Sequence, residues 1–460
     1  MECGGLRRRF PIRERRAIRV RVGSAAPQYN SGGEAAALHG RPPHQTSCYS
    51  PHVRLLVLLL LVALPLRAER VRVVVAADAR QEVIDALQTA TNIEPWGDSP
   101  AFVAEMDVAE AARLQRDPRV RAVSLDTGGG GGLAQSIPII GANVTRAQGI
   151  DGRGRTIAIL DSGVDRMHPD LAGRVVAEQC FCDNFDSGCC PGGGVAQSGI
   201  GAADDDNGHG THVAGIAAGA GIVAPPGVAP AANIVAVKVL DAANRFRGFT
   251  QIYRALEWIA DTRPDVDVVN MSLGSDALFT DQQCSTAAFT FGFAHVVHRL
   301  RARGVLIAAS TGNTSSSTST WMPACIQDVL GVGATWDFAG DHCGVQSNTP
   351  DEVVCQSNSS SSMDIVAPGW WIVSSRRGGG TVQFAGTSMS APHVAGTILL
   401  MKQVGGRSLH ADLIEDILKR TGVPAFDKRN GLTFPRLDAL AAVNATPRAP
   451  NAPRRRATRR

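Results

Sequence analysis

The 460-residue sequence predicts an α/β fold: a parallel β-sheet with helices on both faces, preceded by a small α+β unit. Three observations predict it. Several short runs are continuously apolar and β-branched, as in strands that are buried on both faces. Helical patterns alternate with these runs, which is typical of parallel sheets. The composition, with 44% hydrophobic residues and 49 glycines, suits a large, loop-rich globular chain.

The first 68 residues precede the folded part. Residues 54–68, RLLVLLLLVALPLRA, begin with an arginine, continue as an apolar run and end on a small residue. This run is too short for a membrane-spanning helix and fits a secretory signal, which we place at residues 53–68. Residues 1–52 are rich in Arg, Gly and Pro and form no signal n-region. We predict that translation begins at Val53 from a non-AUG codon, so that residues 1–52 are not made; the alternative is a genuine long or disordered leader.

Residues 69–132 are predicted to form the small α+β unit and its linker. From residue 71 to residue 126, β-like runs such as VRVVVAA and RVRAVSLD alternate with helical runs such as RQEVIDALQTA and VAEAARLQRD. This pattern predicts two helices and at least three strands. The unit ends at TGGGGG, residues 127–132, a flexible linker.

Residues 133–445 are predicted to form the main domain. The buried-strand runs are RTIAILD, NIVAVKVL, VDVVNMSLG, GVLIAAS and VLGVGA, and helices such as QIYRALEWIAD and TFGFAHVVHRLRARG separate them. In parallel sheets, binding and catalytic sites form at the carboxyl ends of the strands. We therefore look for functional side chains directly after these runs.

Charge is unevenly distributed along the chain. The net charge is +4, but arginines gather in residues 1–52 and in the Pro- and Arg-rich tail, residues 446–460, which is predicted to be disordered. The part between these ends is mildly acidic. A nucleic-acid partner is therefore not predicted.

The cysteines predict disulfide bonds. Eight of the ten follow the signal, and an even number in an exported chain favours bridges. Adjacent Cys189 and Cys190 are each expected to reach back to Cys180 or Cys182, in a pairing that stays open; the alternative for CFCDNFDSGCC is a metal knot. We predict four bridges and no free thiol in the mature chain, with the other two as Cys284–Cys325 and Cys343–Cys355.

Four polar residues lie where strands end or helices begin. Asp161 ends the run RTIAILD, His209 opens the helical pattern HVAGIAAG, and Asn313 follows the run GVLIAAS. In GTSMSAPHVAG, a proline is tolerated in the first turn of a helix, so the helix is predicted to begin near Ser388, among unpaired N–H groups. Because these elements meet at one edge of a parallel sheet, we expect the four side chains to lie together.

Each residue alone also has a purely structural interpretation: Asp161 as a strand-end cap, His209 as a helix cap, Asn313 as a turn former and the serines as backbone caps. No purely structural interpretation accounts for their joint occurrence in these contexts. The motifs DSGVD, HGTHVAG and GTSMSAPHVAG resemble those of the subtilisin-like serine proteases, the subtilase family, and the resemblance runs from residue 135 to residue 443. Residues 71–126 resemble the family's inhibitory prodomain more weakly.

The resemblance implies a role for each of these residues. Ser388 is the nucleophile, because a seryl hydroxyl attacks at neutral pH when a base takes its proton. His209 is that base and then the acid for the leaving amine, and Asp161 orients the imidazole. Asn313 and the Ser388 N–H form the oxyanion hole. Ser390, His212 and His393 match motif positions with structural roles.

Substrate-binding residues also follow from the resemblance. The strand Ser272, Leu273 and Gly274 is expected to pair with an extended peptide, so recognition is largely by main chain and specificity is broad. Phe249 matches a wall of the pocket for the fourth residue before the cut. Trp321 falls near the floor of the primary pocket, where the family has a small residue, and its bulk suggests a shallow pocket.

A structural calcium ion is implied with less support. Gln135 and Asp170 match ligands of the family's strong site, but the loop AGAGIVAPPGVAP is shorter and lacks the family's asparagine ligand. Backbone carbonyls are the remaining candidates for a cation that takes six or more oxygens. No organic cofactor is expected.

The function expected from these features is that of a secreted, extracellular serine endopeptidase. It is made as a self-processing zymogen, acts on proteins or peptides as a monomer and is inhibited by its own prodomain until it matures. The alternatives are a catalytically inactive scaffold of the same fold, and a relative that passes the acyl group to an amine instead of water.

Overall fold

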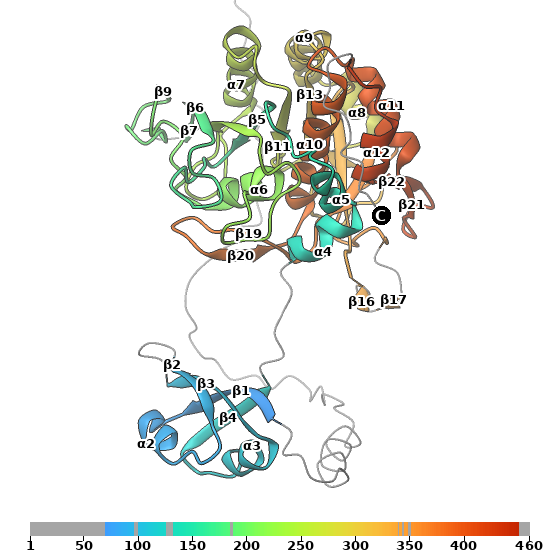
Figure 1. Ribbon diagram of the computed structural model, residues 1–460. Coiled ribbons are helices and arrows are strands. Elements are labelled where there is room, and N and C mark those ends of the chain that lie inside the picture. The colour runs from blue at the N-terminus through green and yellow to red at the C-terminus, as the bar shows by residue number, and fades with distance from the viewer. Residues whose placement is uncertain are drawn as a thin grey trace, which may run out of the picture. The chain divides into compact units, whose positions relative to one another are not determined.

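The structure is a computed structural model of the chain, and it describes residues 70–95, 100–125, 132–184, 187–338, 340–342, 345–347 and 351–449. These residues form two compact units, one within Met1–Thr127 and the other within Gly128–Arg460 (Figure 1). The predicted leader and signal peptide, most of the glycine linker and residues 450–460 lie outside the described residues.

The described residues of the N-terminal unit form a four-stranded antiparallel sheet, in the order β2-β3-β1-β4, with two helices. Val73 and Val75 of one strand and Phe102 and Met106 of its neighbour are buried in one small core, because alternate residues of a strand share a face. The predicted α+β character of this unit is confirmed. Its elements are β1 (Arg70–Ala77), α2 (Arg80–Asp85), β2 (Thr91–Pro95), β3 (Ala101–Asp107), α3 (Val108–Leu114) and β4 (Val120–Leu125).

The second unit contains a ten-stranded sheet in the order β21-β22-β18-β15-β13-β11-β5-β10-β6-β9. The strands from β22 to β6 are parallel, and the edge strands β21 and β9 run antiparallel to their neighbours. The strands are β5 (Thr156–Asp161), β6 (Val175–Phe181), β9 (Ala196–Ser198), β10 (Asn233–Lys238), β11 (Val268–Met271), β13 (Leu306–Ser310), β15 (Leu330–Thr335), β18 (Ile365–Pro368), β21 (Val423–Phe426) and β22 (Thr433–Arg436).

Four short antiparallel strand pairs among the described residues of the second unit lie outside this sheet. They are β7 (Asp183–Asn184) with β8 (Ser187–Gly188), β12 (Leu278–Phe279) with β14 (Thr320–Trp321), β16 (Gly340–His342) with β17 (Val345–Ser347), and β19 (Ile372–Ser375) with β20 (Thr381–Phe384).

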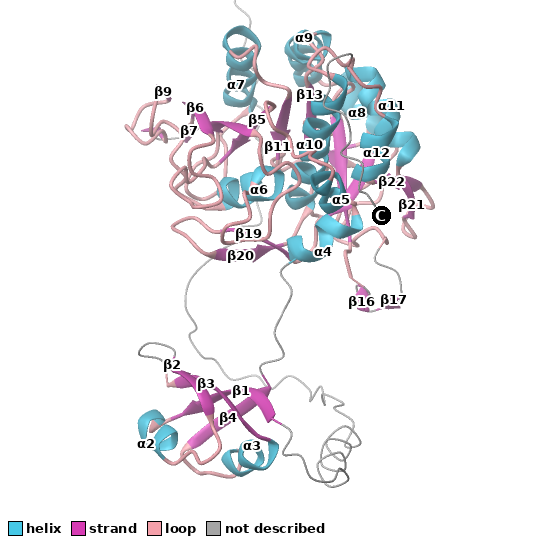
Figure 2. Cartoon of the chain, in the orientation of Figure 1, coloured by secondary structure: helices cyan, strands magenta, loops and turns pink. Residues whose placement is uncertain are grey.

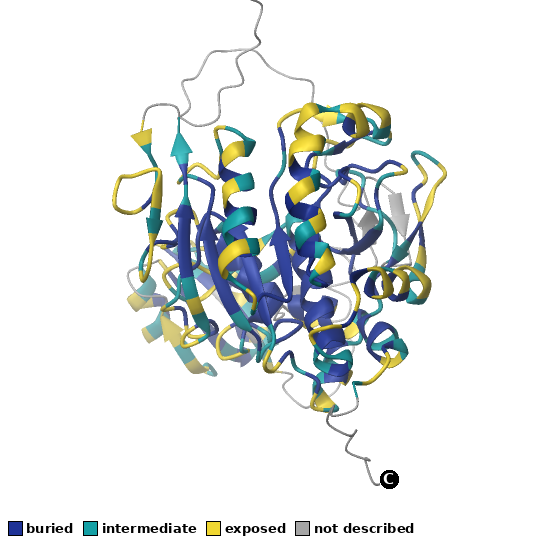
Figure 3. Cartoon of the chain, turned by 90° about the horizontal axis from the view of Figure 1, so that it is seen from above, coloured by how far each residue is buried: buried dark blue, intermediate teal, exposed yellow. Residues whose placement is uncertain are grey.

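Helices cover both faces of the sheet (Figure 2). In β5, Ile157 and Ile159 belong to one core and Ala158 and Leu160 to the other, so the strand is buried on both sides. Figure 3 shows the strands as buried between helices whose outer faces are exposed. The first core is shared with α4 (Gly132–Ile139), α5 (Ala142–Ala147), α6 (His209–Ala218), α10 (Thr387–Gly405), α11 (Ala411–Thr421) and α12 (Ala439–Ala445), and the second with α7 (Phe249–Thr262), α8 (Asp281–Thr286) and α9 (Ala288–Ala302).

This arrangement confirms the predicted α/β fold class, a parallel sheet between two helical layers. Among the helices of the described residues, none has the length and apolar character that crossing a membrane requires.

Three disulfide bonds are described. Cys180 pairs with Cys190 and Cys182 with Cys189, which resolves the pairing that the sequence left open and excludes a metal knot. Cys284 pairs with Cys325, as predicted. Cys355 is also disulfide-bonded, whereas its predicted partner Cys343 lies outside the described residues. The two bridges in the Gly- and Asp-rich segment 180–190 hold a stretch that has little apolar surface to bury, and such bridges typically add about 2–4 kcal/mol each.

Candidate active site

Asp161 and His209 form a hydrogen-bonded pair at the carboxyl edge of the sheet. Asp161 is the last residue of β5 and is fully buried, and His209 is the first residue of α6. His209 Nδ1 lies 2.8 Å from Asp161 Oδ1, which also accepts the N–H of Ser162 at 2.7 Å. A carboxylate that accepts from Nδ1–H fixes the tautomer in which Nε2 carries the free lone pair.

The surroundings of His209 favour its charged form. Burial alone lowers the pKa of the imidazole, but the negative charge and the hydrogen bond of Asp161, together with the charge of Asp205, outweigh burial and raise the pKa above its ordinary value. The site is therefore arranged to stabilise an imidazolium, the form that arises when the ring accepts a proton.

Glycine at position 210 lets α6 begin directly against the end of β5. A Cβ on Gly210 would lie 2.0 Å from the Gly163 carbonyl oxygen and 3.0 Å from the Asp161 Cβ. A larger residue would push the helix start, and His209 with it, away from Asp161. This close approach explains why the motif histidine is followed by glycine.

Asp205 holds the end of β5 and the start of α6 together through hydrogen bonds, a role that was not predicted from the sequence. Its buried carboxylate accepts from Ser162 Oγ at 2.8 Å and from the Gly208 N–H at 2.8 Å, and also from the N–H of Thr211 at 3.0 Å. The loop of Asp161 and the start of α6 are therefore tied to one side chain. The run DDDNGHG contains three candidate acids, and nothing in its spacing distinguishes the buried one from its exposed neighbours.

Ser388 is the second residue of α10, so its N–H has no partner within the helix. Its Oγ donates to the Ser272 carbonyl at 3.3 Å, and no hydrogen bond joins it to His209 among the described residues. In this structure the hydroxyl is therefore engaged with the backbone of the segment that follows β11.

Pro392 does not lie in the first turn of this helix, contrary to the prediction. The helix begins at Thr387, and Pro392 is its sixth residue. A proline has no N–H to donate to the carbonyl four residues earlier, which here belongs to Ser388. Ser272 Oγ donates to that freed carbonyl at 2.7 Å. The proline thus leaves an acceptor through which the segment after β11 is bound to the backbone of Ser388.

Asn313 lies three residues beyond the end of β13 and faces the start of α10. Its Oδ1 accepts from the N–H of Thr387 at 2.9 Å and from Thr387 Oγ1 at 3.0 Å. Gly386 makes the approach possible, because a Cβ there would lie 3.0 Å from Asn313 Nδ2. With Oδ1 occupied, the NH₂ group of Asn313 is the part of the amide left to donate.

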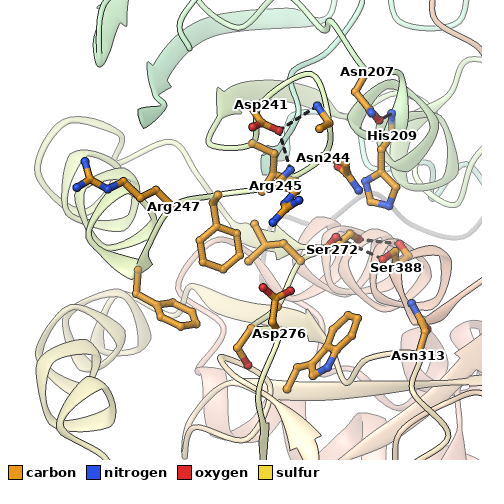
Figure 4. A pocket seen from close by; sticks show the side chains of 18 of the residues that line it. Asn207, His209, Asp241, Asn244, Arg245, Arg247, Ser272, Asp276, Asn313 and Ser388 are labelled. Atoms are coloured by element: carbon orange, nitrogen blue, oxygen red, sulfur yellow. Dashed lines mark hydrogen bonds between the residues drawn. The ribbon is translucent and has the colours of Figure 1, made fainter. Parts of the chain in front are cut away.

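His209, Asn313 and Ser388 border one cleft of about 1120 Å³ (Figure 4). The segment after β11 forms part of its wall, and the first residue of α7 stands farther along it. Phe249 contacts Phe246 and Phe289 there, with ring centroids 5.2 and 5.5 Å apart. Phe289 was not predicted, since its run reads only as a helical pattern. The predicted residues that line the cleft are His209, Phe249, Ser272, Leu273, Gly274, Asn313, Trp321 and Ser388.

The two other motif histidines are buried and neutral. His212 Nε2 lies 3.0 Å from the Ile372 carbonyl, and burial, with the charge of His209, lowers its pKa to about 3. His393 Nδ1 lies 2.8 Å from the Met389 carbonyl, and burial lowers its pKa to about 4. Neither lines the cleft, in agreement with the predicted structural roles.

The predicted calcium site does not fit a cation. The carboxylate of Asp170 is buried and accepts the backbone N–H groups of Ile222, Val223 and Ala224 at 2.5, 2.9 and 2.8 Å, and the Ser375 hydroxyl at 3.4 Å. A carboxylate has about four acceptor positions, and all four are in use. Burial raises the pKa of this carboxyl, but the three N–H bonds outweigh it and the pKa is lowered.

Nearby groups do not restore the site. Gln135, the other predicted ligand, is exposed and makes no hydrogen bond to Asp170 among the described residues. Arg174 donates to the backbone carbonyls of Asp170, Ala218 and Pro230, so a guanidinium uses oxygens that a cation would need. No group of three or more His, Cys, Asp or Glu side chains in the described part of the chain is arranged to hold a metal ion.

Because Asp170 has no acceptor position left for a cation, we expect a chelator to leave the melting temperature of the protein unchanged. Asp170→Asn should lower the free energy of unfolding by about 2 kcal/mol, with or without added calcium, because an amide accepts at one oxygen only and adds donors that face N–H groups. Thermal unfolding in EDTA and in calcium measures this, with the exposed Asp204→Asn as the matched control. A calcium-dependent rise in melting temperature that Asp170→Asn removes would contradict it.

A seryl hydroxyl, an imidazole backed by a buried carboxylate and a side-chain amide at one cleft of an α/β sheet define the class: a serine hydrolase. The comparisons then give the particular family. Residues 152–440, more than half of the chain, match the Subtilase family. The chain therefore belongs to the subtilase family, and it is a serine endopeptidase.

Similar proteins include subtilisin E of Bacillus subtilis, 33% identical over 309 residues that cover 65% of this chain and 70% of that protein. The thermostable alkaline protease of Halalkalibacterium halodurans is 30% identical over 315 residues, 67% of this chain and 74% of that protein. Among solved structures, that of a cold adapted subtilisin-like serine proteinase is 28% identical with a TM-score of 0.48, and the match covers 63% of this chain and 90% of that chain.

Proposed function

We propose that this serine endopeptidase cleaves proteins through an acyl-enzyme intermediate, with Ser388 as nucleophile, His209 as base and Asp161 as the group that orients the base. The observation that carries the proposal is the position of His209. It is held by a 2.8 Å contact to buried Asp161 on one side and borders the cleft of Ser388 and Asn313 on the other.

In the proposed reaction His209 accepts a proton from the attacking nucleophile and then donates it to the leaving group, once in each half of the reaction. Ser388 Oγ leaves the Ser272 carbonyl and attacks the peptide carbonyl carbon while His209 Nε2 takes its proton. The oxyanion that forms faces Asn313 Nδ2 and the Ser388 N–H. His209 then protonates the leaving amine, and an acyl ester remains on Ser388. A water molecule repeats the sequence, releases the acid and restores the hydroxyl.

We propose that substrates bind as an added strand. The segment Ser272–Gly274 continues from β11 into the cleft, and an extended peptide can pair with its backbone. Phe249 and the aromatic side chains around it would receive an apolar residue farther from the cut. Protein or peptide substrates are therefore recognised mainly by main chain, and neither a nucleic acid nor an organic cofactor takes part.

We further propose that the enzyme is exported, made as a zymogen and active as a monomer. The signal-like run at residues 53–68 supports export, and the bridges Cys180–Cys190, Cys182–Cys189 and Cys284–Cys325 suit an oxidising compartment. The N-terminal α+β unit would act as an intramolecular inhibitor, removed by cleavage at the glycine linker before Leu133.

A fluorophosphonate probe tests the proposed nucleophile directly. We expect stoichiometric labelling of Ser388 and loss of labelling after heat unfolding, because the probe needs an activated hydroxyl. The masses of the products from a peptide substrate incubated with a free amine then separate hydrolysis from transfer. An unlabelled, folded protein would indicate an inactive scaffold, and products that carry the amine would indicate transpeptidation.

A further inference from the structure

The indole of Trp321 occupies the space between two walls of the cleft. Trp321 ends β14, where it pairs with Leu278 of β12, and its backbone N–H donates to the Thr311 carbonyl at 2.9 Å. This places its side chain between the segment Ser272–Gly274 and the loop that carries Asn313. Trp321 itself lines the cleft.

The ring lies directly against two glycine backbones. A Cβ on Gly274 would lie 2.8 Å from both Cβ and Cε3 of Trp321, and a Cβ on Gly312 would lie 2.4 Å from its Cδ2. Both distances are far below van der Waals contact. The space that two missing side chains leave free is therefore filled by one indole.

This space is the one next to the reacting bond. Ser388 Oγ is bonded to the Ser272 carbonyl at 3.3 Å, and Asn313 follows Gly312 directly. A peptide whose carbonyl carbon lies at Ser388 and whose oxygen faces Asn313 must direct the side chain of that same residue between the Ser272–Gly274 segment and Gly312. We call the residue that contributes this carbonyl the acyl-side residue.

The backbone that carries the indole is held on several sides. Ser275 N–H donates to the Met322 carbonyl at 2.9 Å, and the Met322 N–H donates to Ser275 Oγ at 3.1 Å. The Cys325 N–H donates to the Trp321 carbonyl at 3.2 Å, and Cys325 is bridged to Cys284. Packing alone fixes the ring itself, since its buried Nε1 has no hydrogen-bond partner among the described residues.

We propose that Trp321 determines cleavage specificity by closing the primary pocket, so that the enzyme cuts after glycine, alanine or serine and rejects large apolar or aromatic acyl-side residues. The proposal rests on the proposed function and adds a substrate class to it. A larger side chain would have to displace an indole that is packed against two backbones.

The test uses peptide anilides that differ only at the acyl-side residue, alanine or phenylalanine, with enzyme concentration set by fluorophosphonate titration. For the unmodified protein we expect kcat/KM to favour alanine by about 100-fold or more. In Trp321→Gly the preference should reverse, with a gain of about 100-fold for phenylalanine, because the emptied space accepts a ring. Trp321→Leu should give an intermediate ratio.

The control is Trp371→Ala, which removes a half-exposed tryptophan outside the cleft and should leave both rates unchanged. Equal rates on alanine and phenylalanine in the unmodified protein would overturn the proposal even if no variant folds, and so would an unchanged ratio in folded Trp321→Gly. Absence of fluorophosphonate labelling would instead contradict the proposed function, so the two failures are distinguishable.

Discussion

Replacement of Ser388 by alanine is expected to abolish peptide hydrolysis, with a loss in kcat of about a million-fold, a size measured for the nucleophile of a subtilisin and carried over to this relative. The loss follows because no other hydroxyl lies in the same position at the start of α10. Hydrolysis of a peptide anilide by the purified, protease-free variant measures it.

Ser390→Ala is the matched control. Ser390 is buried, and its Oγ donates to the Ala367 carbonyl at 2.9 Å, so its loss should lower stability by about 1 kcal/mol without affecting turnover per folded molecule. If Ser390→Ala and Ser388→Ala lost activity equally, the assignment of the nucleophile would be wrong.

The Ser388→Ala protein should also keep the N-terminal unit attached. Self-processing requires the same nucleophile, and the glycine linker lies directly before Leu133. Sequencing the N-terminus of the exported protein checks both points: the unmodified chain should start close to Leu133 and the variant close to residue 69. Normal maturation of the variant in a protease-free host would show that another enzyme makes the cut.

Replacement of Asn313 is expected to cause the second largest loss of turnover. Asn313→Ala should reduce kcat by about 100- to 1000-fold with little change in KM, because the amide donates to a charge that develops only in the transition state. This magnitude also comes from a subtilisin and is carried over. Steady-state kinetics over a range of peptide concentrations separates the two constants, and a raised KM with unchanged kcat would contradict the role.

A second variant separates donation by Asn313 from its structural contacts. Its Oδ1 accepts from Thr387 N and Oγ1, so Asn313→Ala also removes two bonds that hold the start of α10. Asn313→Asp keeps an acceptor for Thr387 and replaces the donor by an oxygen. We expect Asn313→Asp to retain the melting temperature and still lose kcat. A variant that keeps its kcat would show that the amide only supports the helix.

The fold was predictable because burial on both faces leaves a direct signal. In β5, Ile157 and Ile159 face one core and Ala158 and Leu160 the other, so these four consecutive residues are all apolar. The position of Asp161 and Asn313 followed from the rule that the carboxyl ends of parallel strands meet. Both inferences need only local sequence and topology.

Other features depend on contacts between distant segments and had no local signal. Pro392 was expected in the first turn of α10, and what compensates for it is Ser272, which is 116 residues from Ser388 in the sequence. The calcium expectation failed because the N–H groups of residues 222–224 turn toward Asp170, which depends on backbone direction and not on residue type. Trp321 was placed near the primary pocket, but its contact with Gly274 and Gly312 appears only once three loops are packed together.

The bridge between Cys284 and Cys325 closes 41 residues of sequence and joins α8 to the turn that follows Trp321. None of the three described bridges includes a residue of α10 or α6, the helices that carry Ser388 and His209. Reduction of this bridge would therefore loosen the backbone that holds Trp321 against the cleft, while the reacting groups keep their positions. In a reducing medium the enzyme would first become less selective, cutting at more places in a protein, before it lost the ability to cut.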